Sequence, residues 1–326
     1  MILRESSNIR PERSMCVIKE KIYFLDSHNC RNLYRMNKDC NCIEIIAYLP
    51  IDISRPESFF LRQKNDVIYL FPEYGGYIYT YNLVTKKVRK GAYLPVLQQD
   101  YMYLQTVSKR DFLYLISTKH DVIRFCFDDD SVHVFDSSDK NQTLLCTGHQ
   151  WGNLVLFVTC VDERVYSFDL DKQETNQLDV LLPKVSIMDV AFDGLSMFFL
   201  TNQGDIYKKK EHSNCAQLEF KYEQLIDNPF FGVVSYKRFL FLIPFNENYL
   251  FVVNDKGSVV KKMCLEDAHD QDGYICSEYY INNNYLYLLP REGRWMFLID
   301  MKELKIKRID MCKGKNKDLE CFIRGL

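Results

Sequence analysis

The feature that most constrains the fold is a repeat of about 44 residues that runs along nearly the whole chain. Its clearest copy, Asp66 to Asn82, reads DVIYLFPEYGGYIYTYN, with two runs of aromatic and β-branched residues around a connector containing proline and glycine. Runs of this composition, bounded by turn residues, predict two β-strands joined by a loop. The residues at the middle of the first run, here called the anchors, are Tyr23, Tyr69, Tyr114, Leu156, Phe198, Phe241 and Tyr287.

Each repeat extends outward from this pair of strands. The second run is centred on Tyr34, Tyr79, Arg124, Tyr166, Tyr207, Phe251 and Phe297. Apolar segments precede the first runs, at 15–18, 59–61, 101–107, 144–146, 187–192, 230–234 and 276–281. Alternating segments follow the second runs, at 43–49, 87–94, 132–135, 174–181, 216–220, 258–265 and 304–309. Four strands in a repeat of this length form one blade of a propeller.

We therefore predict an all-β fold, a seven-bladed β-propeller with four antiparallel strands in each blade. The propeller is expected to span residues 14–312 and to bring its first blade against its last. Residues 1–13 form an N-terminal tail, and residues 313–326 either complete the ring or pack on it.

Two features recur at fixed places in the repeat. An Asn or Asp stands three residues after the centre of the second run at Asn37, Asn82, Asp169, Asn254 and Asp300. Such side chains accept hydrogen bonds from the backbone two residues on, so we expect a capped turn before each outer strand. Lysines gather on or near that strand, as at Lys87 and Lys90, where charge discourages pairing with another chain. A nucleic-acid or phospholipid patch is the less favoured interpretation of these lysines.

Composition narrows the functional classes. The net charge of −2 indicates no general attraction to nucleic acid or to an anionic membrane. Residues 1–13 lack the apolar run of a secretory signal, and the longest apolar run, 239–245, is too short to span a membrane. The 12 cysteines are scattered differently in each repeat, unlike a disulfide framework. We expect reduced cysteines and a cytoplasmic protein that contacts neither nucleic acid nor membrane.

The string VIYLFPEYGGYIYTYNLVTKKVRKGAYLP resembles a Kelch repeat, in which a hydrophobic strand, a Tyr-led second strand, an Asp turn and a closing Leu-Pro recur. The chain departs from that pattern where Pro72 and Glu73 replace the double glycine and Val88 replaces the tryptophan. The resemblance implies a β-propeller of Kelch-like repeats. It covers all seven repeats in outline.

The sequence carries no motif of a known catalytic or metal site. It contains no nucleophile elbow, His-Glu-x-x-His motif, phosphate-binding loop or dinucleotide fingerprint. The segment 266–273 places Asp270, Asp272 and Gly273 like the middle of a calcium loop, but both end ligands are missing. A group of three cysteines, Cys30, Cys40 and Cys42, also falls short, because its spacing is unlike that of a zinc site. We expect no metal and no cofactor.

Polar residues recur nine positions before the anchors, on the strand expected to line the central channel. The candidate channel residues are Gln105, Thr147, Asp189 and Glu278. Propeller channels are often polar and filled with water, so this pattern also fits a wet channel without chemistry. The functional interpretation is that the two carboxylates, beside Gln105 and Thr147, hold a polar ligand.

The loops between the second and third strands form the other candidate surface. They carry Tyr74, His120, Arg164, Arg291, Arg294 and Trp295. Aromatic and arginine side chains contribute most of the energy at recognition surfaces, and this mixture suits a peptide or a sugar.

We predict a non-enzymatic binding or scaffold module that uses this loop face to recognise a protein, peptide or glycan partner. The alternative is an enzyme or small-ligand binder acting on a carbohydrate or polar metabolite, with Asp189 and Glu278 as its carboxylate pair. Propellers host both classes, so the fold alone leaves the choice open.

Overall fold

The chain folds into antiparallel β-sheets. The computed structural model describes residues 11–26, 29–37, 43–50, 59–95, 103–117, 121–135, 144–151, 153–159, 164–182, 185–210, 213–224, 226–265, 278–289 and 295–310. These residues contain 28 strands in seven four-stranded sheets and no helix, in agreement with the predicted fold class. None of the described segments could therefore cross a membrane as a helix. The sheets are called blades 1 to 7 in chain order.

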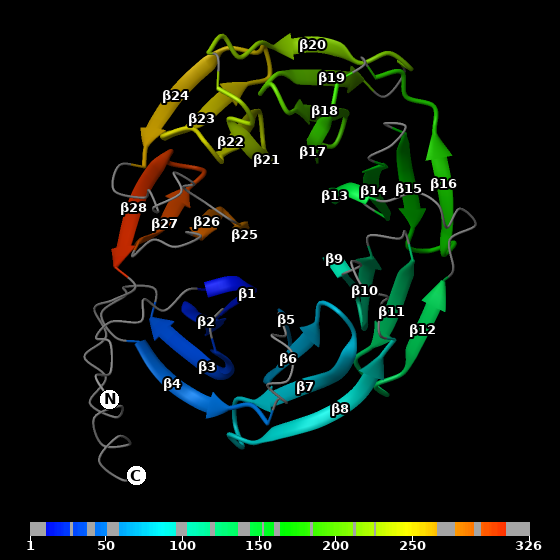
Figure 1. Ribbon diagram of the computed structural model, residues 1–326, viewed down its shortest axis with the longest axis vertical. Helices are drawn as coiled ribbons and strands as arrows, with labels where there is room; N and C mark the ends of the chain where they lie inside the picture. The colour runs from blue at the N-terminus through cyan, green and yellow to red at the C-terminus, as the bar shows by residue number, and fades with distance from the viewer. Residues whose placement is uncertain are drawn as a thin grey trace. The chain divides into compact units, whose positions relative to one another are not determined.

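The chain divides into two compact units, and the first contains blades 1, 2 and 7. Blade 1 contains β1 (Pro11–Ile18), β2 (Lys21–Asp26), β3 (Asn29–Asn37) and β4 (Ile43–Tyr48). Blade 2 contains β5 (Phe59–Lys64), β6 (Val67–Pro72), β7 (Gly76–Asn82) and β8 (Val88–Leu94). Blade 7 contains β25 (Glu278–Asn282), β26 (Tyr285–Leu289), β27 (Trp295–Asp300) and β28 (Lys305–Asp310). The first strand of blade 1, β1, lies beside both β5 and β25 (Figure 1).

The second unit contains blades 3 to 6. Blade 3 contains β9 (Tyr103–Lys109), β10 (Phe112–Ser117), β11 (Val122–Cys126) and β12 (Val132–Phe135). Blade 4 contains β13 (Leu144–Trp151), β14 (Leu154–Thr159), β15 (Val165–Asp169) and β16 (Glu174–Leu178). Blade 5 contains β17 (Ile187–Phe192), β18 (Ser196–Thr201), β19 (Ile206–Lys210) and β20 (Gln217–Phe220). Blade 6 contains β21 (Phe230–Tyr236), β22 (Phe239–Pro244), β23 (Tyr249–Asn254) and β24 (Val259–Cys264). The first strands of successive blades are again neighbours, in the order β9, β13, β17, β21.

The repeat read from the sequence coincides with the blades. All seven anchors lie on the second strand of their blade, and none is more than 8% exposed. The centres of the second runs all lie on the third strands. The predicted bounds of β12 and β17 agree with the structure at both ends, and most others differ by one to three residues. The predicted N-terminal tail, 1–13, overlaps the start of β1 at Pro11, and the C-terminal segment lies outside the described residues.

The hydrophobic core lies between neighbouring blades. In the first unit, one cluster joins blades 1 and 2, and a second, containing Met15, Phe24, Tyr287 and Met296, joins blade 1 to blade 7. The first repeat therefore packs against the last, as predicted. In the second unit, three clusters join blades 3 and 4, 4 and 5, and 5 and 6. Both faces of the inner strands are thus covered, which explains their near-continuous hydrophobic runs. Full burial of one such side chain contributes about 1.5–3 kcal/mol.

The predicted Asn and Asp caps are formed in blades 2, 4, 6 and 7. Asn82 Oδ1 accepts hydrogen bonds from the backbone N–H groups of Val84 at 2.9 Å and Thr85 at 2.8 Å. Asp169 accepts from the N–H groups of Asp171 and Lys172, at 2.9 and 3.1 Å. Asn254 and Asp300 cap their turns in the same way. The cap orders the hairpin from which the outer strand begins.

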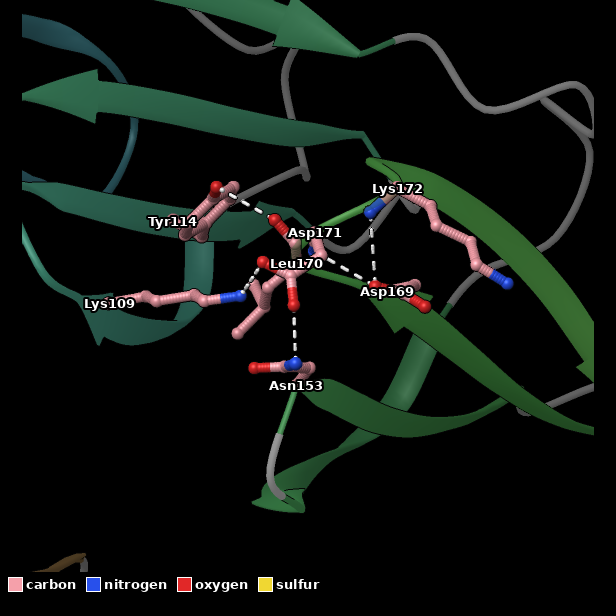
Figure 2. Close-up of polar contacts among 7 residues, drawn as sticks. All are labelled: Lys109, Tyr114, Asn153, Asp169, Leu170, Asp171 and Lys172. Carbon is pink, nitrogen blue, oxygen red and sulfur yellow. Dashed lines mark hydrogen bonds and ion pairs between the residues drawn. The ribbon is translucent and has the colours of Figure 1, made fainter.

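Figure 2 shows how the capped turn of blade 4 is joined to blade 3. The backbone N–H of Leu170 donates to the carbonyl oxygen of Asn153 at 2.7 Å, within blade 4. The Leu170 carbonyl accepts from the hydroxyl of the blade 3 anchor Tyr114 at 3.2 Å, and Asp171 binds Lys109 of blade 3 as well as Asn153. An anchor tyrosine therefore fixes its own blade and also its neighbour.

Candidate binding face

The two ends of a blade carry different connections. One end, here the turn face, carries the turn between the first and second strands and the turn between the third and fourth. A backbone hydrogen bond of 2.7–2.9 Å joins these two turns in blades 2, 3, 4 and 7: Leu83 to Asp66, Phe127 to Asp111, Leu170 to Asn153 and Met301 to Asn284. The opposite end, the loop face, carries the connections between the second and third strands. Since function concentrates in loops held by a rigid scaffold, the loop face is the candidate for recognition.

The loop face of blade 2 carries a cluster of exposed tyrosines. Tyr74 lies in the β6–β7 loop, Tyr77 lies at the start of β7, and Tyr93 lies opposite Tyr77 on β8. Their exposed fractions are 41%, 43% and 50%. Gly75 and Gly76, with φ of 84° and 123°, make the sharp loop that separates Tyr74 from Tyr77.

Contacts within the cluster orient its rings. The rings of Tyr77 and Tyr93 meet edge to face, with centroids 4.9 Å apart and planes at 76°. The ammonium group of Lys90 lies 3.5 Å from the centroid of the Tyr77 ring, a cation–π contact. These three residues, together with the exposed Tyr74 of the adjoining β6–β7 loop, are called the blade 2 tyrosine patch below. It presents aromatic surface next to a positive charge.

This patch includes one predicted binding residue, Tyr74. Among the other predicted loop-face residues, Arg164 is exposed immediately before β15, on the loop face of blade 4. Trp295 begins β27, but its side chain lies outside the described part of the chain. His120, Arg291 and Arg294 also lie outside the described residues.

The register of the inner strands gives three of the four predicted channel residues the same pairing position within their own blades. Gln105, Asp189 and Glu278 each lie opposite the residue two places after the anchor of their blade, namely Ile116, Leu200 and Leu289. Thr147 lies one step away, opposite Phe157, because irregularities in β13 shift its pairing. The side chains of Gln105, Thr147 and Glu278 are outside the described part of the structure.

Asp189 is the channel residue whose surroundings are described. Its carboxylate is buried, with 5% of the residue exposed. One oxygen accepts the backbone N–H of Val190 at 2.9 Å, and the other accepts the N–H of Val233 on β21 at 2.8 Å. The side chain therefore joins the inner strands of blades 5 and 6. A ligand would compete with two backbone hydrogen bonds for this carboxylate.

Two cavities lie elsewhere in the described residues. One of about 280 Å³, between blades 4 and 5, is lined by apolar side chains such as Phe192 and Met197 and by polar ones such as Lys209. The other, of about 470 Å³, is lined by blade 7 residues and Glu20. Neither contains a predicted channel or loop-face residue. No group of three or more His, Cys, Asp or Glu side chains in the described segments is arranged to hold a metal ion.

Sequence reasoning missed Tyr77, Lys90 and Tyr93. Tyr77 belongs to the alternating series Tyr77, Tyr79, Tyr81, whose last two members are buried, so the series indicated a buried strand. A register shift in the pairing of β7 with β8 falls between Tyr77 and Tyr79. The alternation of tyrosines thus continues through this register shift, and the shift leaves Tyr77, the first tyrosine of the series, exposed. The sequence signal for this patch was a pair of tyrosines, Tyr77 and Tyr93, at the loop ends of β7 and β8.

Comparison with solved structures confirms the class of fold defined by these blades, the β-propeller. The chain is similar to a streptogramin B lyase, with a TM-score of 0.65 and 9% identity over 88% of this chain and 93% of that one. It is also similar to a catalytically inactive virginiamycin B lyase from Staphylococcus aureus with quinupristin, with a TM-score of 0.64 and 9% identity over 93% and 96% of the two chains.

A third similar structure is BamB from Moraxella catarrhalis, with a TM-score of 0.55 and 8% identity over 86% of this chain and 80% of that one. No protein-family model matches the sequence, and no curated protein matches it. At such low identities the likeness shows the fold alone, and the function has to be argued from the side chains of this chain.

Proposed function

We propose that the protein is a non-enzymatic binding module that recognises a protein or peptide through the loop face of its propeller. The observation that carries this proposal is the blade 2 tyrosine patch. Tyrosine supplies a large, rigid contact area with a polar tip and is enriched in the residues that dominate binding energy.

The chemistry of the patch favours a peptide over a glycan. A sugar ring stacks on the flat face of an aromatic side chain, but Lys90 already covers one face of the Tyr77 ring. An ammonium group beside exposed aromatic edges suits a partner segment with an acidic residue next to an apolar one. A glycan partner remains the alternative within the same proposal.

The enzyme alternative draws no support from Asp189. A general base or a nucleophile must come within hydrogen-bond reach of its substrate. This residue is only 5% exposed, and its two carboxylate oxygens join two blades through backbone N–H groups. Gln105, Thr147 and Glu278 stay predicted channel residues whose role is untested.

The proposal includes the cellular setting expected from the sequence. We place the protein in the cytoplasm, acting without nucleic acid or membrane as partner. The supports are the near-neutral charge and the cysteines, of which Cys16, Cys126 and Cys215 are thiols outside any disulfide. The assignment of the repeats as Kelch-like belongs to this proposal too, and it rests on the Tyr-led third strands and the capped turns.

The test is capture of partners by full-length protein, with partner peptides then identified by mass spectrometry and their affinities measured. Tyr77→Ser with Tyr93→Ser is expected to weaken a captured partner at least about tenfold, since truncating an interface hot spot costs about 2 kcal/mol or more. The control is Val84→Ser, a more exposed apolar site (70%) in the β7–β8 turn on the turn face of the same blade. Equal binding by the double variant and the wild type contradicts the proposal, and parallel screening of a glycan array tests the alternative.

A further inference from the structure

The first unit contains a set of side chains at one level of its inner strands that the binding face does not use. Cys16, Arg62 and Tyr280 lie on β1, β5 and β25, and each is paired with the anchor of its own blade, Tyr23, Tyr69 and Tyr287. Because β1 lies beside both β5 and β25, the three positions are neighbours. In blades 3, 5 and 6 the same position holds Val107, Ala191 and Val234. Three adjacent blades thus carry chemically active side chains where blades 3, 5 and 6 carry small apolar ones.

The contacts of Arg62 leave most of its hydrogen-bonding capacity unused. Its Nη1 donates to the carbonyl oxygen of Leu61 at 2.6 Å, and the guanidinium carbon lies 5.9 Å from the centroid of the Phe60 ring. Electrostatic interactions connect it to Tyr280 and Cys16. Within the described segments no carboxylate forms an ion pair with Arg62. A guanidinium offers five N–H donors, and a neighbouring carbonyl and an aromatic ring do not neutralise its charge.

The two neighbours of Arg62 are neutral at physiological pH. Burial raises the pKa of the Cys16 thiol to about 12, although the Arg62 charge acts in the opposite direction. Burial likewise raises the pKa of the Tyr280 hydroxyl. Burial lowers the pKa of Arg62, because a cation with little water around it is disfavoured. Arginine nevertheless stays protonated in proteins, so the site holds a positive charge that no carboxylate of the described segments pairs.

An uncompensated charge in partly buried surroundings is costly unless something pairs with it. The guanidinium fork matches the two oxygens of a carboxylate or phosphate group and binds them by two parallel hydrogen bonds. A protonated tyrosine hydroxyl beside it is a further donor to the same oxyanion. The expected ligand is therefore an anionic group small enough to reach the inner strands.

We propose that Arg62, assisted by the Tyr280 hydroxyl, forms an anion-binding site that receives the carboxylate or phosphate group of a small ligand. This site is separate from the blade 2 tyrosine patch. Arg62 is third from the turn-face end of β5, whereas Tyr77 is the second residue of β7, at its loop-face end. The proposal therefore does not depend on the proposed partner recognition.

The test is titration of full-length protein with sodium acetate, sodium sulfate and sodium phosphate at constant ionic strength, followed by calorimetry and by thermal unfolding. We expect saturable binding and a rise in Tm with at least one anion. Acetate identifies a carboxylate site, and phosphate or sulfate identifies a site for doubly charged oxyanions. The expected loss in Arg62→Met is at least about tenfold in affinity, the value of one charge-assisted hydrogen bond.

Two further variants keep the result interpretable. Arg62→Lys retains the positive charge but not the guanidinium fork, so it is expected to bind the anion more weakly than the wild type. It replaces Arg62→Met as the test variant if Arg62→Met does not fold. Arg89→Met removes an exposed arginine of β8 and is expected to bind like the wild type. The proposal is overturned if none of the three anions binds the wild type saturably, or if both Arg62 variants bind with wild-type affinity.

Discussion

Gly257 marks a close approach of two blades, and its replacement by alanine tests how tightly blades 5 and 6 pack. It lies in the β23–β24 turn with φ of 72°, a conformation that L-residues rarely adopt. A Cβ at this position would lie 1.7 Å from the carbonyl oxygen of Glu219 and 2.8 Å from its carbonyl carbon. Glu219 belongs to β20, the outer strand of blade 5. Backbone faces backbone here, so no side-chain rotation can relieve the clash.

Two costs in free energy of unfolding add in the Gly257→Ala variant. The left-handed conformation costs an alanine about 1–2 kcal/mol. Overpacking a well-filled contact costs about 1–3 kcal/mol more, and the absence of a movable side chain places it in the upper part of that range. The expected loss in free energy of unfolding is therefore about 3–5 kcal/mol. Separation of the blades would also disturb the hydrogen bond from Lys208 Nζ to the Asp255 carbonyl, which is 3.3 Å long.

Gly194→Ala is the matched control in the same unit. Gly194 has φ of 101°, and a Cβ there meets no atom within 4 Å. This variant carries the conformational cost alone, about 1–2 kcal/mol. The assay is urea unfolding of both variants followed by circular dichroism. If Gly257→Ala is no less stable than Gly194→Ala, the close approach of blades 5 and 6 is refuted.

Three further predictions concern single side chains. The N–H groups of Lys172 and Asp171 hold the pKa of Asp169 below its usual value. The contribution of Asp169 to stability is therefore complete above the unfolded pKa of about 3.9 and is lost as pH falls through the lower folded pKa. The urea midpoints of the wild type and Asp169→Ala should accordingly differ at pH 7 and converge in acid. Iodoacetamide at pH 8 should modify the exposed Cys215 but not the buried Cys16, because burial raises the pKa of the Cys16 thiol to about 12. Detection of alkylated Cys16 in folded protein by mass spectrometry would contradict its buried placement. Tyr222→Phe removes the hydroxyl that donates to the buried Glu247 carboxylate, so it should lower the free energy of unfolding by about 1–3 kcal/mol. An unchanged urea midpoint would argue against that hydrogen bond.

The fold could be predicted because each blade repeats one local pattern. The anchors combine a bulky side chain with period-two alternation, and this combination fixes both strand type and burial. The capping residues were equally readable, since the hydrogen bonds of Asn82 and Asp169 are local to the chain. Neither prediction required knowledge of which blades are neighbours.

The candidate sites depend on irregularities and on contacts between blades, which the repeat does not encode. The pairing of Thr147 is shifted by one residue through irregularities in β13, one of which contains Gly148. The partner of Asp189, the Val233 N–H, lies on the next blade, 44 residues along the chain. Arg62 gains its neighbour Tyr280 only because the last repeat packs against the first.

The most direct test of the account is photocrosslinking from the loop face of blade 2. A benzophenone amino acid replaces Tyr74 in one sample of full-length protein and Val84, on the turn face of the same blade, in another. After irradiation with a captured partner, the account predicts a covalent adduct from position 74 and none from position 84. An adduct from position 84 alone would show that the partner binds the opposite face, contradicting recognition by the tyrosine patch.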